Sequence, residues 1–216
     1  MFDKISIIEK TDITYLKGDL NKEKLANIFN IFSKNNFASL CIPIEYLIYK
    51  NEYLNKNNKK ITTVIGFPFG YDSIDFKKYQ LEKSIFYGCD EFDIVFNIGK
   101  FIDKDYNYIY NELKSLINLT YNKITKIIIE TCYLTKQQIL DATQLVIDSG
   151  ANFVKTSTGF GHSGAKEEDI LLIKNKFHDR IMIKASGGIK DLNIAVKMLE
   201  AGADRLGISD VSFLIN

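Results

Sequence analysis

Short apolar runs alternate with longer amphipathic segments along almost the whole chain. The run at 126–130 carries three successive isoleucines, which is typical of a parallel strand buried on both faces. The segment at 21–34 carries an apolar stripe with helical spacing, which predicts a helix. The apolar runs predict strands at 12–16, 38–42, 61–65, 91–96, 126–130, 153–155, 180–184 and 205–207. Helical patterning predicts helices at 21–34, 43–54, 73–87, 106–119, 135–149, 166–176 and 191–200.

Local signals agree with several of these boundaries. Thr135 and Gln138 form a capping-box pattern at the start of one helix, and Gly150 follows its end. Gly88 occupies the same position after the helix at 73–87. The polar run at 55–60 is expected to be a solvated loop.

Strands that alternate with helices predict right-handed βαβ units and a parallel sheet. Eight such repeats in 216 residues fit an α/β fold of the (β/α)8 TIM-barrel type. A doubly wound open sheet is the main alternative, but the first strand is not followed by a Gly-x-Gly-x-x-Gly pattern. No linker interrupts the chain, so we expect residues 1–216 to form a single domain.

Composition narrows the class of partner. The chain is 46% hydrophobic and 25% charged with a net charge of +1, so no strong field favours nucleic acid or an anionic membrane. Its three cysteines, Cys41, Cys89 and Cys132, have neither disulfide-framework nor zinc spacing, which favours a reducing compartment. The N-terminus lacks the pattern of a signal peptide, and no apolar run is long enough to span a bilayer. We therefore expect a cytoplasmic protein without nucleic-acid or membrane partners.

Charged residues gather near the expected strand ends. Asp93 lies in the fourth strand, and Glu130, Lys155 and Lys184 end the next three. Active sites of such barrels lie at the C-terminal ends of the strands. Lys155 and Lys184 would lie on neighbouring strands about 4.8 Å apart. The pattern therefore predicts two lysines close together at the functional end of the barrel.

A pair of buried lysines has a specific chemical use. Burial and a neighbouring cation both disfavour the ammonium form, so Lys184 could make Lys155 a neutral amine nucleophile for imine formation. Asp93 could then move protons to and from the intermediates. The alternative, to which the spacing alone gives equal weight, is a buried ionic cluster in which the lysines pair with Asp93 and Glu130.

Two glycine-rich segments follow the last two strands. Ser186-Gly187-Gly188 and Gly207-Ile208-Ser209 lie where barrels frequently bind phosphate through backbone N–H groups. These loops predict a phosphate site that includes Gly187, Gly188, Gly207 and Ser209. Cys41 is interpreted as a small core residue, and the two histidines, His162 and His178, are expected to be exposed.

Several motifs together resemble the deoxyribose-phosphate aldolase family, and the resemblance covers nearly the whole chain. The most specific is Phe153-Val154-Lys155-Thr156-Ser157-Thr158-Gly159, which resembles the family's Schiff-base lysine motif. Similar motifs are Thr63-Val64-Ile65-Gly66-Phe67-Pro68, Asp90-Glu91-Phe92-Asp93, Ile129-Glu130-Thr131-Cys132 and Lys184-Ala185-Ser186-Gly187-Gly188-Ile189.

The resemblance implies a class I aldolase that reversibly cleaves 2-deoxy-D-ribose 5-phosphate into acetaldehyde and D-glyceraldehyde 3-phosphate. It implies that Lys155 forms the imine, that Lys184 perturbs it and that Asp93 relays protons. It also implies that the enzyme needs no metal or organic cofactor and forms a homodimer. Residues that match the family's pocket are Asp12, Thr14, Leu16 and Cys41, and the loop from Thr156 to Gly159 would shape the bed of the substrate.

The chain departs from the family pattern at Ile13, Gly18 and Asp210. Asp210 follows Ser209, and a carboxylate beside a phosphate site would weaken binding by like-charge repulsion unless it points away or caps the final helix. Two other functions remain open. One is a transaldolase-like imine enzyme with another substrate, which would not release acetaldehyde. The other is a catalytically silent barrel that binds a phosphorylated sugar, which would show no turnover.

Overall fold

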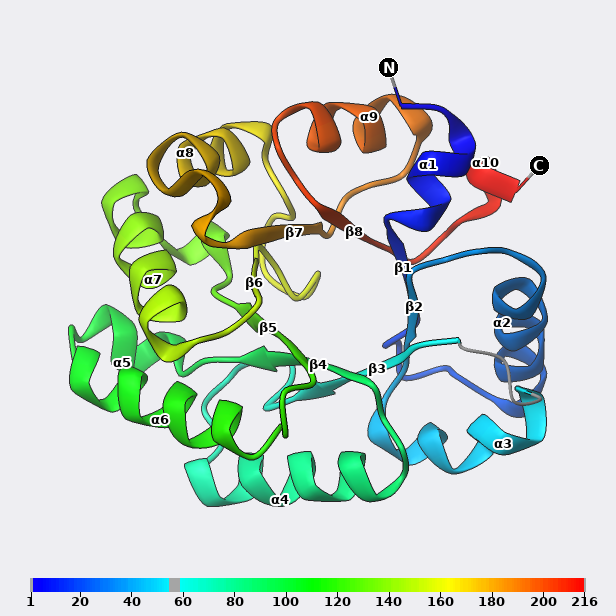
Figure 1. Ribbon diagram of the computed structural model, residues 1–216, viewed down its shortest axis with the longest axis horizontal. Coiled ribbons are helices and arrows are strands. Elements are labelled where there is room, and N and C mark those ends of the chain that lie inside the picture. Colours follow the sequence, from blue (N-terminus) through cyan, green and yellow to red (C-terminus); the bar gives the residue numbers. More distant parts are fainter. Residues whose placement is uncertain (1, 55–58, 216) are drawn as a thin grey trace.

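The computed structural model describes residues 2–54 and 59–215, and its eight strands close into a parallel barrel (Figure 1). Each strand pairs with the next, and β8 pairs with β1 to complete the ring. The predicted (β/α)8 barrel is confirmed, and the open doubly wound sheet is excluded. The strands are β1 (Thr11–Thr14), β2 (Ser39–Cys41), β3 (Ile61–Ile65), β4 (Glu91–Val95), β5 (Ile124–Ile128), β6 (Phe153–Lys155), β7 (Met182–Ser186) and β8 (Arg205–Ile208).

Two strand predictions were shifted along the chain. β7 begins at Met182 because residues 178–180 form a short 3-10 turn, η3 (His178–Arg180). Lys184 therefore lies in the middle of β7 and does not end it. β5 begins at Ile124, where pairing with Glu91 of β4 starts. Glu130 lies beyond the strand in a left-handed conformation with φ of 51°.

The predicted major helices are present and surround the strands (Figure 1). Among the described residues, no helix combines the length and apolar character needed to cross a membrane. Of the loop predicted at 55–60, residues 55–58 lie outside the described residues. The long helices are α2 (Lys22–Lys34), α4 (Ile74–Phe86), α6 (Tyr106–Asn118), α7 (Lys136–Ser149), α8 (Glu167–Phe177) and α9 (Leu192–Glu200).

The capping box and the helix-ending glycines expected from the sequence are present in the structure. Thr135 and Gln138 make the reciprocal capping box that opens α7. Gly150 and Gly88 adopt φ values of 88° and 76°, which are the left-handed conformations that end a helix.

Three short helices were not predicted, and one predicted helix is wrong in kind. The segment at 43–54 forms a 3-10 helix, η1 (Ile44–Tyr49), followed by α3 (Lys50–Tyr53). Leu47 is the one buried residue of η1, and α3 has no buried residue. No apolar stripe therefore stabilises a continuous α-helix over this segment. The unpredicted helices have four to six residues each, too few for a periodic signal: α1 (Lys4–Glu9), α5 (Ile98–Ile102) and α10 (Ser212–Ile215).

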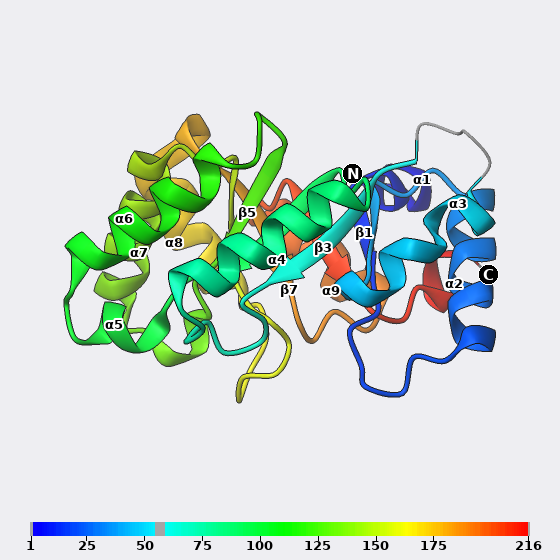
Figure 2. The same cartoon turned by 90° about the horizontal axis from the view of Figure 1, so that it is seen from below.

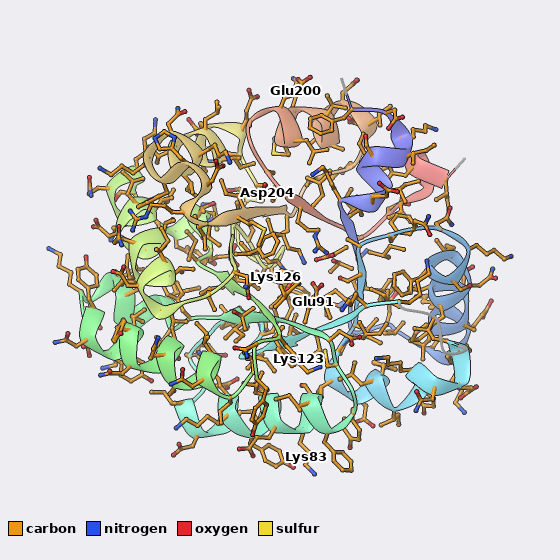
Figure 3. The ribbon with its side chains drawn as sticks, in the orientation of Figure 1. Lys83, Glu91, Lys123, Lys126, Glu200 and Asp204 are labelled. Carbon is orange, nitrogen blue, oxygen red and sulfur yellow. The ribbon has the colours of Figure 1, made fainter. Side chains whose placement is uncertain are left out.

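The barrel separates two kinds of interior. A continuous apolar core fills the space between the strands and the surrounding helices. Inside the ring of strands, by contrast, charged side chains meet, and Figure 3 shows Lys126 and Glu91 there while Lys83 lies outside on α4. Successive residues of a strand point to opposite sides, so Asp93 and Lys126 face the axis while the next residues, Ile94 and Ile127, face the helices.

Candidate active site

A cavity of about 310 Å³ opens at the C-terminal end of the strands. Figure 2 shows the loops that follow β1 and β6 extending on this same side of the barrel. The loops after β7 and β8 complete the wall. The cavity is lined by Thr14, Tyr15, Leu16, Lys17, Lys155, Thr158, Gly159, Phe160, Ser186, Gly187, Gly188, Ile189, Gly207, Ser209 and Asp210.

Lys155 lies at the floor of this cavity at the end of β6. Its side chain is only 2% exposed, yet it lines the cavity. Its Nζ donates a hydrogen bond to Oδ2 of Asp93 at 2.7 Å. Burial lowers the pKa of Lys155, and although Asp93 opposes this, the nearby Lys184 ammonium lowers it further. The arrangement favours the neutral amine that attack on a carbonyl requires.

Asp93 is the centre of the charged network. Its Oδ2 accepts hydrogen bonds from both Lys155 and Lys184, at 2.7 and 2.8 Å, and its Oδ1 accepts one from Lys126 at 3.0 Å. Burial favours the neutral acid, but the three surrounding ammonium groups outweigh it and hold the pKa of Asp93 well below its usual range. The carboxylate is therefore ionised and can exchange protons with either lysine.

Lys184 stands beside Lys155 in the register of the sheet, as predicted. Its Nζ donates to Oδ2 of Asp12 at 2.5 Å as well as to Asp93. Burial disfavours its charge, but the two carboxylates prevail and raise its pKa. Gly207 leaves the space for this side chain, because a Cβ there would lie 3.2 Å from Cε of Lys184. The two lysines thus have opposite pKa shifts although they share one carboxylate oxygen.

The sequence interpretation missed three members of this network. Nζ of Lys126 lies 2.7 Å from Oε2 of Glu91. The carboxylates around Lys126 raise its pKa, against the effect of burial. Arg205 donates to Oδ1 of Asp12 at 2.6 Å. A signal was available, because Glu91 is two residues from Asp93 and must share its face of β4. Lys126 was harder to identify from the sequence, because the residue it pairs with, Asp93, lies on another strand.

Counting charges explains how the network can hold a neutral Lys155. The carboxylates of this ion-paired network are Asp12, Glu91 and Asp93, and its cations other than Lys155 are Lys126, Lys184 and Arg205. Three negative charges therefore balance three positive charges before Lys155 gains a proton. A fourth positive charge would be unpaired in a buried site, which is costly. The buried ionic cluster and the amine nucleophile, treated as alternatives in the sequence, are compatible.

Glu130 fixes the loop that follows Lys155. Its carboxylate accepts hydrogen bonds from the backbone N–H and from the hydroxyl of Thr158. Burial raises the pKa of Glu130, although the bonds from Thr158 oppose the shift. Gly161 packs so closely here that an added Cβ would lie 2.6 Å from Sγ of Cys132. Glu130 therefore shapes the cavity wall. Among the described residues it forms no ion pair with Lys155 or Lys184, contrary to the cluster that the sequence suggested.

The predicted substrate residues fall into two groups. Those that line the cavity are Thr14, Leu16, Gly159, Gly187, Gly188, Gly207 and Ser209. The others, Asp12, Cys41 and Thr156, are buried and, in the described structure, stand behind the cavity wall. Burial raises the pKa of the Cys41 thiol to about 12, which agrees with its interpretation as a core residue. The cavity also includes Tyr15, Lys17 and Phe160, which the sequence interpretation did not select.

The remaining candidates for chemistry lie elsewhere. His162 and His178 are exposed, as predicted, and the ring of His162 packs against Tyr133. Within residues 2–54 and 59–215, no three His, Cys, Asp or Glu side chains are grouped so as to hold a metal ion. The carboxylates inside the barrel are instead paired with ammonium and guanidinium groups.

Comparisons with known proteins agree with this geometry. The family model described as DeoC/LacD family aldolase matches residues 6–209. A deoxyribose-phosphate aldolase from Caldicellulosiruptor saccharolyticus is 42% identical over 209 residues, which cover 95% of each chain. The solved structure titled "QR15, an Aldolase" is 34% identical, with a TM-score of 0.91 over 95% of this chain and 92% of that chain. A deoxyribose phosphate aldolase from Aeropyrum pernix, described as tetrameric, is 24% identical and shares the fold with a TM-score of 0.90 over 98% of this chain and 91% of that one.

Proposed function

The chain belongs to the DeoC/LacD family of aldolases, and on this premise we propose that it reversibly cleaves 2-deoxy-D-ribose 5-phosphate through an imine on Lys155. The products are acetaldehyde and D-glyceraldehyde 3-phosphate. The observation that carries the proposal is a buried lysine with a lowered pKa at the floor of a cavity, hydrogen-bonded to a carboxylate. The whole chain, residues 1–216, acts as one catalytic domain.

The charged network assigns a role to each side chain. Lys155 attacks the C1 carbonyl of the open-chain sugar as a neutral amine, and the carbinolamine takes up a proton and loses water to give the protonated imine. The positive charge on the imine then draws the electron pair of the C2–C3 bond as the C3 hydroxyl loses its proton. D-glyceraldehyde 3-phosphate leaves, and the enamine remains on Lys155. Protonation of the enamine carbon and hydrolysis release acetaldehyde and restore the amine.

Asp93 and Lys184 are placed to serve these proton transfers. Asp93 Oδ2 lies within 2.8 Å of both amines, so a proton can pass between Lys155 and Lys184 through one carboxylate oxygen. Lys184 keeps its proton in the resting site because Asp12 also contacts it. The imine, once formed, carries the positive charge that Lys155 lacked, and Asp93 stabilises it by proximity. No metal or organic cofactor takes part in these steps.

Two measurements test the proposal. Incubation with acetaldehyde and borohydride, followed by peptide mass spectrometry, should locate a reduced adduct on Lys155. An adduct on Lys184 alone, or no adduct, refutes the assignment of the nucleophile. Release of acetaldehyde from 2-deoxy-D-ribose 5-phosphate should follow in a coupled assay. Imine trapping without release of acetaldehyde would favour a transaldolase-like enzyme. Absence of both trapping and acetaldehyde release would favour a silent sugar-phosphate-binding barrel.

The assembly is proposed to be a homodimer that acts in the cytoplasm. Support comes from an exposed aromatic face on α4, where Phe76, Tyr79 and Phe86 are 49%, 54% and 80% exposed. Lys83 lies over the rings of Tyr79 and Phe86. Apolar patches of this kind often mark protein interfaces. Light scattering should give the mass of a dimer, and Phe86→Lys should convert it to a monomer; a wild-type monomer refutes the assembly.

A further inference from the structure

Two opposite charges occupy the outer rim of the cavity. Lys17 follows β1 and Asp210 follows β8, and both line the same cavity as Lys155. Lys155 is buried, whereas Lys17 and Asp210 are exposed, so they lie at the mouth and not at the floor. Among the described residues that line the cavity, these three alone are lysine, arginine, aspartate or glutamate, and Lys155 is held as the neutral amine. The charge at the mouth is therefore set by one lysine and one aspartate.

The aspartate is held in place at this rim. Oδ1 of Asp210 accepts a hydrogen bond from the backbone N–H of Ser212 at 3.0 Å. That bond, with the more distant charge of Lys17, lowers the pKa of Asp210 and keeps it ionised near neutral pH. The fixed carboxylate lines the same cavity as Gly187 and Gly188 of the neighbouring loop after β7, whose φ values of 82° and 79° are left-handed conformations suited to glycine.

We propose that Asp210 and Lys17 are specificity-determining residues, which set how strongly the site prefers a phosphorylated sugar over its neutral, unphosphorylated counterpart. The inference rests on the proposed aldolase function. Lys17 attracts a phosphate group at the mouth, and Asp210 repels it. Because the two charges offset one another, preference for phosphate depends on the glycine-rich loops, and 2-deoxy-D-ribose itself becomes a second substrate of the same site.

The charge on the phosphate provides an independent signature. A phosphate monoester gains its second negative charge near pH 6, whereas Asp210 is ionised well below that pH. Because imine formation on Lys155 also changes with pH, the quantity compared is the KM for the phosphorylated sugar divided by the KM for 2-deoxy-D-ribose. With the mouth balanced, this ratio changes little in the wild type from about pH 5.5 to 7.5, which are assay conditions on either side of about pH 6. Asp210→Asn leaves Lys17 unopposed, so the same ratio should fall as the dianion forms.

The experiment compares kcat and KM for 2-deoxy-D-ribose 5-phosphate and 2-deoxy-D-ribose. Asp210→Asn keeps an oxygen for the N–H of Ser212, and we expect its KM for the phosphorylated sugar to fall about three- to tenfold at low salt. Lys17→Met should raise that KM by a similar factor, while either variant shifts the KM of the neutral sugar less than about twofold. Lys22→Met, an exposed lysine on α2, is the matched control and should change neither.

The outcomes separate this inference from the proposed function. A wild type that forms the imine and cleaves the phosphorylated sugar, with Asp210→Asn changing both substrates equally or neither, overturns the inference alone. A wild type without turnover overturns the proposed function, and the inference is then read from calorimetric titration with inorganic phosphate. In that titration Asp210→Asn must bind phosphate more tightly than the wild type and Lys17→Met more weakly; equal affinities overturn it. High salt should shrink all these differences, because screening acts on exposed charges.

Discussion

Removal of Lys184 is the sharpest test of the charge count inside the barrel. Lys184→Met deletes an ammonium that lies 2.5 Å from Asp12 and 2.8 Å from Asp93. The site then holds three carboxylates and two remaining cations, so a proton on Lys155 restores neutrality. We expect the pKa of Lys155 to rise, because the neighbouring ammonium that disfavours its charged form is gone. The neutral fraction at neutral pH would then fall, by about one to two orders of magnitude at most.

The rate of borohydride trapping with acetaldehyde, measured against pH, reports this change directly. Trapping needs the neutral amine, so the rate rises with pH through the pKa of Lys155 in every variant. In Lys184→Met the rise should move to higher pH, with a rate at about pH 7 that is lower by one to two orders of magnitude at most and partly recovers in alkaline solution. An unchanged rate with an unchanged pH profile would refute the argument that Lys184 and the charge balance keep Lys155 neutral.

Stability must be separated from chemistry in this experiment. Leaving Asp12 and Asp93 short of one buried cation should lower the free energy of unfolding by about 3–5 kcal/mol. Lys77→Met is the matched control, because Lys77 is equally buried and its Nζ lies 2.7 Å from Oε1 of Glu112. This pair does not line the cavity. It should lose similar stability in urea but keep the pH profile of trapping. If Lys184→Met does not fold, Lys184→Arg retains the positive charge. Its trapping rate should rise with pH in the same range as that of the wild type.

Further predictions concern the packing around the site and the helices outside it. Glu112→Leu should lower the free energy of unfolding by about 3–5 kcal/mol in urea titration, since it leaves the buried ammonium of Lys77 without its carboxylate, and Lys77→Met in addition should recover part of the loss. Gly207→Ala should reduce turnover at least about tenfold with an unchanged circular dichroism spectrum, because its Cβ would press on Ser186 and Lys184; near-normal turnover would show that Lys184 tolerates displacement. Thr158→Val should cost about 1–3 kcal/mol by removing a hydrogen bond to the buried Glu130, and a loss below 0.5 kcal/mol would show that the backbone N–H suffices.

Much of the fold could be read from local pattern. Runs of β-branched residues, such as the isoleucines of β5, and stripes of helical period specify which segments are strands and helices, because both depend on neighbours along the chain. The alternation of the two then restricts the topology to parallel βαβ units. Strand ends were less accurate, and β7 was displaced by two residues, since pairing with β6 decides where a strand begins.

The candidate nucleophile was also accessible from sequence. Lys155 and Lys184 were predicted to be neighbours because consecutive strands of a parallel barrel lie side by side, and the register pairs them. That argument needs only the order of the strands. Asp93 was found as a charged residue of the fourth predicted strand, near the strand ends where the active sites of such barrels lie. The family motif around Lys155 added the chemistry that strand order alone leaves open.

The tertiary structure decided what surrounds that lysine. In the sequence Lys126 is one charged residue beside a run of isoleucines, and a lone lysine is usually exposed. Closure of the barrel turns it inward against Glu91 and Asp93 and brings Arg205, from the last strand, onto Asp12 of the first. Local pattern therefore determined the elements and the reactive lysine. The balance of charge that favours a neutral Lys155 exists only once β8 meets β1, because Coulomb interactions depend on distances that the linear order does not contain.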